Sequence, residues 1–332
     1  MPACTIVRVT EASQRGQARR CAVEWAERLA FGPERSGRVA IVATELASNL
    51  VKHAPRGGCM FIGTAVSNGM VGVTIVAVDS GPGIPDERRA LEDGFSTAGS
   101  AGIGLGAVDR LSDSFEIYSQ AGGGTVVVSR LWREARHETK PVFAAGLCGM
   151  MEGESVSGDD FSIIERDGRT RIVLADGLGH GPGAEEASHA AIETFERAGA
   201  IPVGEVIASM HGALRSTRGA AVAVAEIDPA QRSLRFAGLG NISGLMGTGG
   251  KLRNLVSHNG TAGHAMRRIQ EFAYELPPDA TVILHSDGIT TRWSLDAYPG
   301  LARRDPAITA AVLYRDFHRG RDDATAVVAH VP

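Results

Sequence analysis

The chain has 332 residues, enough for two domains of ordinary size or one large one, each with its own core. Lysine and arginine number 34 and aspartate and glutamate 38, and a net charge of −4 argues against a protein that binds nucleic acid through a basic surface. The 43% hydrophobic and 22% charged residues are typical of a globular protein, and 42 glycines, close to twice the usual share of about 7%, indicate functional loops.

The cysteines and the first residues indicate the compartment. The four cysteines are scattered and form no C-x-x-C pair, which is typical of a reducing environment. Residues 1–20 are charged and lack a long hydrophobic run, so we expect no secretory signal. Residues 57–78 are uncharged, but Asn68-Gly69 between two apolar runs favours a β-hairpin over a membrane span. We therefore predict a cytoplasmic protein that does not bind membranes.

The first half combines amphipathic helices with short strands. Hydrophobic residues recur at helical spacing over 17–30 and 36–54. A loop-rich stretch and a short helix are expected at 79–106 and 105–112, and strands at 59–66, 70–78, 114–119 and 124–131. The charged segment 133–141 ends in a proline and marks a boundary. We predict an N-terminal domain over 1–133, a linker over 134–141 and a C-terminal domain over 142–332.

Polar side chains in the first half are spaced as in a nucleotide site. Glu45 and Asn49 are four residues apart on a predicted helix and so share one face. A carboxylate and a carboxamide there can orient a nucleophile and hold a hard cation, although the pair taken alone favours an exposed polar helix face. Asp79 ends an apolar strand and can accept a hydrogen bond from an exocyclic amine.

A run of glycines follows that strand. Gly102, Gly104 and Gly106 precede the helix predicted at 105–112, where free backbone N–H groups and a positive helix end can receive phosphates. The run does not fit the dinucleotide fingerprint G-x-G-x-x-G, because Asp109 stands where that pattern needs a small residue. The glycines alone therefore leave the kind of nucleotide open.

The order of these motifs, which ends with Gly124-Thr125, resembles the ATP-binding fold of the GHKL group. More narrowly, Asp93-Gly-Phe-Ser-Thr97 and the sequence after it resemble the RsbT-type switch kinases, serine/threonine kinases that phosphorylate STAS-domain anti-sigma antagonists or scaffold proteins. The resemblance covers nearly the whole first half. It implies an α/β sandwich that binds ATP and Mg²⁺.

The same resemblance implies roles for single residues. Glu45 would polarise the substrate hydroxyl and Asn49 would ligate Mg²⁺. Asp79 would read the adenine, and Thr125 would lie beside it. The remaining nucleotide contacts would come from a lid over 86–101 and from Gly81, Gly83, Gly102, Gly104 and Gly106.

The second half is richer in strands. Two helices, near 184–198 and 203–217, stand together between the third and fourth of seven β-type runs, which are residues 142–148, 160–168, 170–176, 220–228, 234–240, 281–287 and 324–331. Strands outnumber helices and the helices come as a pair, so two sheets covered by helices are expected.

Aspartates at strand ends predict a metal site in this half. Asp176 and Asp287 each end an apolar strand and precede glycine, and Asp322 opens a third strand. One Asp-Gly is usually only a turn, but three carboxylates so placed can converge as ligands for Mg²⁺ or Mn²⁺, with the carbonyl of Gly177. Zinc is not supported, because the histidines lack ligand spacing and cysteine partners.

These motifs, with Ser157-Gly-Asp159-Asp before them, resemble the SpoIIE and RsbX branch of the PPM phosphatases. The resemblance implies an α-β-β-α sandwich in which Asp176 bridges two Mn²⁺ or Mg²⁺ ions, Asp287 and Asp322 hold one of them, and the Gly177 carbonyl binds the other. Asp159 would act through water. Such a site hydrolyses phosphoserine or phosphothreonine with activated water. Residues 237–245 also resemble the middle of RsbX-type domains, but no chemistry is assigned to them.

We therefore expect an α+β protein that is a bifunctional signalling switch, a protein serine/threonine kinase joined to a metal-dependent phosphatase. The expected partners are STAS-domain or anti-sigma regulators. One alternative is that the first half only binds ATP and a partner, as an anti-sigma-like module, without phosphorylating it. A second alternative is that the second half is a degenerate scaffold, although its three strand-end aspartates argue against this.

Overall fold

The computed structural model describes residues 3–67, 69–91, 104–134, 143–266 and 268–331. The chain forms two compact units, an N-terminal unit over Cys4–Val142 and a C-terminal unit over Phe143–Pro332 that also includes Met1–Ala3. Of the predicted linker 134–141, all but Glu134 lies outside the described residues. The domain limits predicted from sequence therefore stay predictions.

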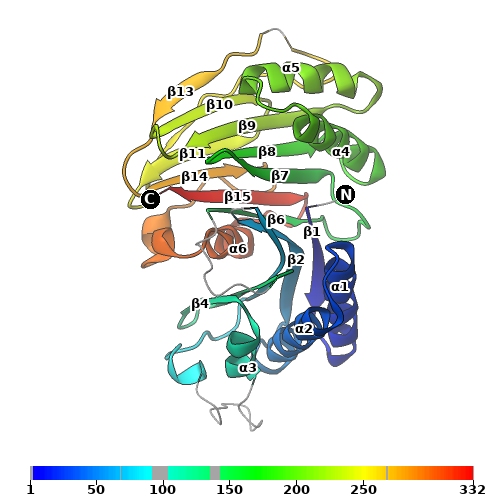
Figure 1. Cartoon of the computed structure of the whole chain (residues 1–332), viewed down its shortest axis with the longest axis vertical. Helices are drawn as coiled ribbons and strands as arrows, with labels where there is room; N and C mark the ends of the chain where they lie inside the picture. The colour runs from blue at the N-terminus through cyan, green and yellow to red at the C-terminus, as the bar shows by residue number, and fades with distance from the viewer. Residues whose placement is uncertain (1–2, 68, 92–103, 135–142, 267, 332) are drawn as a thin grey trace. The chain divides into compact units, whose positions relative to one another are not determined.

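The N-terminal unit is one antiparallel sheet with helices (Figure 1). Its strand order is β1-β2-β3-β5-β4. The strands are β1 (Cys4–Val9), β2 (Gly58–Ser67), β3 (Met70–Asp79), β4 (Ser114–Gln120) and β5 (Gly124–Trp132). The helices are α1 (Arg15–Arg28), α2 (Pro33–His53) and α3 (Gly104–Leu111), with short 3-10 turns at Ala12–Gln14 and Arg89–Leu91.

Two helices and the sheet enclose the core of this unit. Proline suits the first position of α2, because that position needs no N–H donor. Trp25 of α1 and Leu46 of α2 pack in one buried cluster with Met60, Ile75 and Leu131 of the sheet. The helix predicted at 36–54 is thus confirmed, although it begins three residues earlier.

The predicted hairpin is also confirmed. Strands β2 and β3 pair in antiparallel register from Gly58↔Asp79 to Ser67↔Met70. Gly69 in the turn has φ +75°, a left-handed conformation that glycine adopts without strain, while Asn68 lies outside the described residues. In the part of the chain that the structure describes, no helix has the length and hydrophobicity of a bilayer span.

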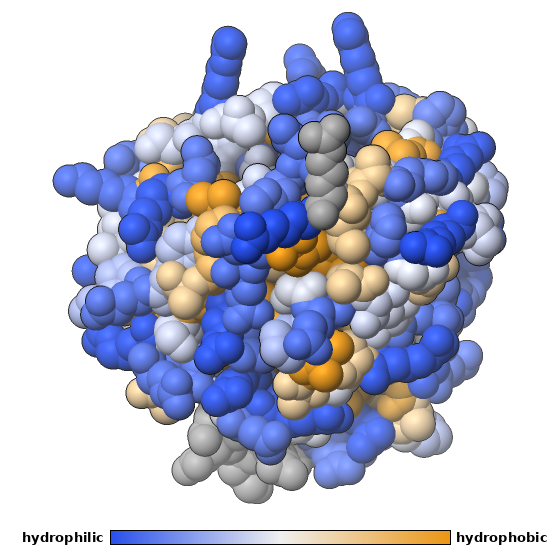
Figure 2. Space-filling view, turned by 90° about the horizontal axis from the view of Figure 1, so that it is seen from above, coloured by the Kyte–Doolittle hydropathy of each residue, from blue (hydrophilic) through white to orange (hydrophobic). Residues whose placement is uncertain are grey.

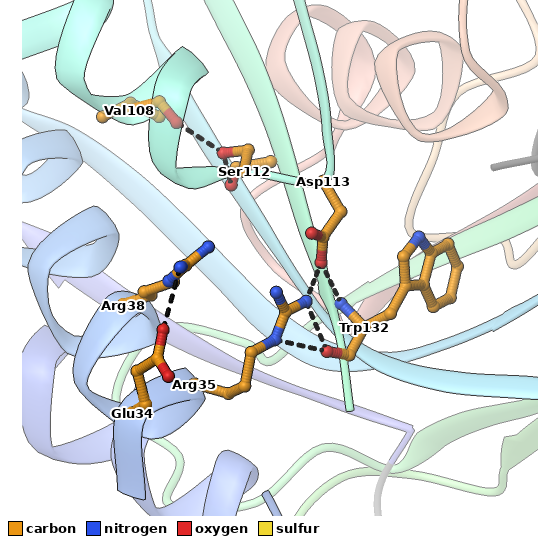
Figure 3. A network of polar contacts seen from close by, with 8 residues as sticks. Glu34, Arg35, Arg38, Val108, Ser112, Asp113 and Trp132 are labelled. Carbon is orange, nitrogen blue, oxygen red and sulfur yellow. Dashed lines mark hydrogen bonds and ion pairs between the residues drawn. The ribbon is translucent and has the colours of Figure 1, made fainter. Parts of the chain in front are cut away.

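A polar cluster ties the start of α2 to the far end of the sheet (Figure 3). The Arg35 guanidinium pairs with Asp113, just after α3, and donates from Nε to the Trp132 carbonyl at 3.0 Å. Asp113 Oδ2 also accepts from the Trp132 backbone N–H at 2.7 Å. The Arg35 side chain is 12% exposed, so this pair is largely withdrawn from water.

The C-terminal unit contains two antiparallel sheets (Figure 1). The first has strand order β13-β10-β9-β8-β7 and the second β12-β11-β14-β15-β6. The first sheet comprises β7 (Asp159–Arg166), β8 (Arg169–Gly177), β9 (Ala220–Asp228), β10 (Ser233–Leu239) and β13 (Phe272–Glu275). The second comprises β6 (Ala144–Gly149), β11 (Ser243–Thr248), β12 (Lys251–Asn254), β14 (Ala280–His285) and β15 (Ala324–Val331).

Helices cover the two sheets from outside. Helices α4 (Pro182–Arg197) and α5 (Val203–Ala213) pack on the first sheet, and α6 (Pro306–Phe317) packs on β6 and β15 of the second. Strands of the two sheets contact each other between these layers. Short 3-10 turns occur at Leu214–Ser216, Leu295–Ala297 and Leu301–Arg303. This α-β-β-α order confirms the fold class expected from the sequence.

Besides short 3-10 turns, four strands and one helix are absent from the sequence prediction. The strands β1, β11, β12 and β13 are only four to six residues long, which leaves little room for a pattern that identifies them. Helix α6 is buried at nine of its twelve positions, so it shows no polar face by which helical periodicity is recognised. Figure 2 shows one face of the molecule, which is mainly hydrophilic with small scattered hydrophobic patches.

Candidate active sites

The N-terminal unit contains a cavity of about 370 Å³ between α2, α3 and the ends of β3 and β5. Five of the residues predicted to bind nucleotide line it, namely Asn49, Asp79, Gly83, Gly104 and Thr125. Segments that are far apart in the sequence thus meet around one cavity.

At one end of this cavity α2 faces the start of α3. A Cβ atom at Gly104 would lie 3.1 Å from Asn49 Oδ1 and 3.4 Å from Glu45 Oε2. Gly104 therefore lets α3 approach both predicted catalytic side chains closely. Asn49 Nδ2 is buried and has no hydrogen-bond partner in the described ranges. A buried donor without a partner is costly, so this N–H group suits a ligand that offers an acceptor oxygen, such as a phosphate group.

At the other end Asp79 and Thr125 are direct neighbours across the β3–β5 ladder. Asp79 Oδ1 accepts the Gly81 backbone N–H at 2.7 Å. The Thr125 hydroxyl is 2.9 Å from that of Ser119, and Thr125 is buried. A carboxylate and a hydroxyl fixed side by side can recognise the donor and acceptor groups of an adenine edge.

The loop after β3 closes this end of the cavity. Gly83 has φ +75°, and a Cβ there would lie 2.0 Å from the Gln120 carbonyl oxygen, so no other residue fits. The next residue, Ile84, donates its N–H to Ser119 Oγ at 2.7 Å. The loop therefore lies against β4 in a fixed position.

The structure leaves part of the predicted nucleotide site undescribed. Gly102 and residues 92–101 of the predicted lid lie outside the described residues. Gly106 is buried within α3 and is not among the residues that line the cavity. The cavity also has an apolar lining that cannot be recognised in the sequence, because its residues follow the ordinary pattern of a core. It includes Leu46, Leu50, Ala77, Ile84 and Val127.

In the C-terminal unit the predicted aspartates come together. Asp159 of β7 and Asp176 of β8 are partners in the strand register. Burial, followed by the negative charges of Asp287, Asp322 and Asp323, raises the pKa of Asp176 to about 7. Burial and the charge of Asp176 also raise the pKa of Asp159 well above its ordinary value. Carboxylates from four separate segments thus repel one another within one centre.

This donor set fits divalent cations. Hard carboxylate oxygens are the ligands that Mg²⁺ and Mn²⁺ prefer, and a cation would offset the repulsion among them. Within the described ranges, no three or more acidic, histidine or cysteine side chains are already arranged around one ion position. The fit therefore rests on the chemistry of the carboxylates and on their mutual charge effects.

Asp323 has a role that the sequence reading missed. Its Oδ1 accepts the Met151 N–H and its Oδ2 accepts the Gly158 N–H, each at 2.7 Å. It is 2% exposed, whereas the adjacent Asp322 is exposed. Both carboxylates contribute charge at Asp176, and Asp323 in addition anchors the loop between β6 and β7.

Glycine is required at position 177. A Cβ on Gly177 would lie 2.0 Å from the Ala184 carbonyl oxygen, so the first turn of α4 packs directly on this backbone. The Gly177 N–H donates to the Gly158 carbonyl at 2.9 Å. At the rim, His180 Nδ1 lies 2.6 Å from Glu154 Oε1, and the His180 side chain is 59% exposed. These contacts fix the loop that follows Asp176.

Comparison with known proteins assigns a different family to each unit. Residues 9–130 match the family described as histidine kinase-like ATPase domain. Residues 166–332 match Stage II sporulation protein E (SpoIIE).

Two curated relatives come from Bacillus subtilis (strain 168). The chain is 42% identical over 107 residues to serine/threonine-protein kinase RsbT. The aligned residues cover 32% of this chain and 80% of RsbT. It is 32% identical over 91 residues to phosphoserine phosphatase RsbX, which covers 27% of this chain. The matched part spans 46% of the length of RsbX.

Two solved structures are similar to this chain. A chain from "The bacterial stressosome: a modular system that has been adapted to control secondary messenger signaling" has a TM-score of 0.53 at 24% identity, covering 56% of this chain and 98% of that one. RsbX in complex with magnesium has a TM-score of 0.49 at 20% identity, covering 58% and 98%. The stressosome chain supports only the fold and not a function.

Proposed function

Because this chain belongs to the SpoIIE family and also carries a histidine kinase-like ATPase domain, we propose that it is a bifunctional switch in partner-switching regulation. The N-terminal unit phosphorylates a serine or threonine of a partner protein, and the C-terminal unit removes such phosphates. The partner is a STAS-domain or anti-sigma regulator, and the four free cysteines suit the reducing cytoplasm.

One observation carries the kinase part of this proposal. Asn49 and Gly104 line one end of the cavity, with Glu45 beside Gly104, and Asp79 and Thr125 line the other end. ATP fits this arrangement with its adenine at Asp79 and Thr125 and its phosphates towards Asn49, whose oxygen would hold Mg²⁺. Mg²⁺ neutralises phosphate charge, which is a large part of catalysis in phosphoryl transfer.

Glu45 supplies the remaining chemistry. Its carboxylate accepts the proton of the acceptor hydroxyl as that oxygen bonds to the γ-phosphorus and ADP leaves. The 42% identity to the RsbT kinase over 107 residues supports this role. A module that merely binds ATP and a partner would have no use for a carboxylate at this position.

The phosphatase part rests on the convergence of the aspartates. Asp176, Asp287 and Asp322 would hold the divalent cations, with the Gly177 carbonyl as a further ligand, and Asp159 would orient water. Bound cations of this kind activate water and neutralise the phosphate of the substrate. Asp323 keeps the surrounding loop in place through its two backbone hydrogen bonds.

Phosphoryl transfer tests the first activity. The full chain is incubated with labelled ATP and a STAS-domain protein, beside the variant Glu45→Ala. We expect transfer by the wild type and its loss in the variant, with ATP affinity retained. ATP binding without transfer by the wild type would instead support the partner-binding module.

Hydrolysis of p-nitrophenyl phosphate with Mn²⁺ tests the second activity. We expect turnover by the wild type and none by Asp176→Asn, which removes a charge at the centre of the carboxylates. A wild-type protein that is folded and binds Mn²⁺ but gives no turnover would contradict the phosphatase proposal.

A further inference from the structure

The turn between β10 and β11 brings an unassigned motif to the carboxylate centre. Residues 237–245 include Asn241, for which the sequence suggests no chemistry. In the structure Asn241 Nδ2 donates a hydrogen bond to Asp287 Oδ2 at 2.7 Å. Asp287 is one of the carboxylates whose charge raises the pKa of Asp176. The turn therefore contacts the centre through a neutral side chain.

The backbone on both sides holds Asn241 in place. The preceding Gly240 has φ +103°, and a Cβ there would lie 2.5 Å from the Cβ of Ala221. Ala221 is the register partner of Asp176 on the neighbouring strand. The Gly240 N–H also donates to the His258 carbonyl at 2.8 Å. The turn is thus packed against the part of the first sheet that carries Asp176.

The other side of the turn belongs to the second sheet. Two residues after Asn241, Ser243 of β11 pairs with His285 of β14, and β14 leads directly to Asp287. Asn241 therefore lies in a connection between the two sheets, one carrying Asp176 and the other Asp287. Its hydrogen bond fixes the Asp287 carboxylate relative to this connection.

Asparagine is well suited to contact Asp287 from this position. An asparagine amide donates hydrogen bonds without adding charge. A lysine or arginine at position 241 would pair with Asp287 and compete with a cation, and an acidic residue would add to the repulsion. A neutral donor occupies one carboxylate oxygen and leaves the negative charge of Asp287 for a metal ion.

We propose that Asn241 is a positioning residue that orients the Asp287 carboxylate for a divalent cation. This inference rests on the proposed phosphatase function of the same centre. Partners that orient metal ligands in this way typically change metal affinity by about 10- to 100-fold when they are removed.

The test measures binding of Mn²⁺ alone to the full chain, by isothermal titration calorimetry without substrate. We expect Asn241→Ala to weaken the Mn²⁺ affinity by roughly 10- to 100-fold and Asn241→Gln, which keeps the amide, to recover part of it. Asn254→Ala, at an exposed asparagine on β12, is the matched control and should bind as the wild type does. If Asn241→Ala does not fold, Asn241→Leu, which is similar in size and lacks the donor, carries the same expectation.

Hydrolysis adds a second readout. For Asn241→Ala, the Mn²⁺ concentration that gives half-maximal turnover should rise, while kcat at saturating Mn²⁺ recovers towards the wild-type value. Wild-type Mn²⁺ affinity in Asn241→Ala, or a lower kcat at unchanged affinity, would overturn the inference. A wild type that binds Mn²⁺ without hydrolysis would refute only the phosphatase function, and one that binds no Mn²⁺ would refute both.

Discussion

The close approach of Gly104 to α2 gives a sharp test of the proposed kinase site. In Gly104→Ala the new Cβ would lie 3.1 Å from Asn49 Oδ1, below the 3.4–4 Å of an ordinary van der Waals contact, and would just touch Glu45 Oε2 at 3.4 Å. The Asn49 side chain must therefore move by a few tenths of an ångström. Because a misplacement of about 1 Å can cost about 100-fold in rate, we expect kcat for phosphoryl transfer to fall roughly 3- to 10-fold.

The stability of Gly104→Ala should not fall with its rate. Alanine is more favourable than glycine inside a helix by up to about 1 kcal/mol, and Gly104 is the first residue of α3. We therefore expect the free energy of unfolding of Gly104→Ala to be unchanged or slightly higher. A loss of rate without a loss of stability would show that the added methyl group acts on the site.

Gly37 on α2 offers the matched control, because a Cβ there would meet nothing within 4 Å. Gly37→Ala should stabilise the helix by about 0.5–1 kcal/mol and leave transfer unchanged. The assay compares kcat and KM for labelled phosphate transfer with thermal unfolding of all three proteins. Full wild-type kcat in Gly104→Ala would refute the placement of Asn49 and Glu45 in the reaction.

The other predictions concern the nucleotide, the metal, pH and the polar cluster. Asp79→Asn should abolish ATP binding, measured by calorimetry, and leave phosphatase turnover intact; a variant that loses both activities while folded would contradict separate sites. Mn²⁺ should raise the Tm of metal-stripped wild type but not of Asp176→Asn, since a ligand stabilises only the state that binds it, and an equal rise in both would refute the assignment. Burial lowers the pKa of His330 below its ordinary value of about 6.5, so the contribution of the neutral imidazole to stability is fully present above that pH and is lost as the pH falls below it. Denaturant titrations should therefore show a smaller difference in the free energy of unfolding between pH 7.5 and 5.5 for His330→Gln than for the wild type. An equal difference in both proteins would show that His330 is not its source. Asp113→Ala should destabilise the protein by about 2–4 kcal/mol in urea unfolding, because it leaves the largely buried Arg35 without its carboxylate, and a change below about 0.5 kcal/mol would show that the pair contributes little.

Much of the fold follows from local pattern in the sequence. The helix that carries Glu45 and Asn49 shows a clear apolar stripe, and the β2–β3 hairpin is marked by its turn residues. Helix α6 could not be predicted in this way, because it is buried nearly all round and lacks a polar face. Its position depends on the second sheet, which forms only when distant strands pair.

The candidate sites likewise combine residues that local sequence pattern identifies with residues whose roles depend on contacts made in the fold. Strand-end aspartates such as Asp176 can be recognised from the glycine that follows each apolar run. The anchoring role of Asp323 could not, since only the folded loop brings the Met151 and Gly158 N–H groups to its carboxylate. The contact between Asn241 and Asp287 likewise joins residues 46 positions apart, and no local pattern encodes it.

The proposed phosphatase centre takes Asp176 from one sheet and Asp287 from the end of a strand in the other. Neither layer alone contains a complete set of carboxylates. During heating, turnover should therefore disappear as soon as the layers separate, even while each keeps its own ladder of hydrogen bonds. For this half of the molecule, enzymatic activity is a direct measure of whether the sandwich is closed.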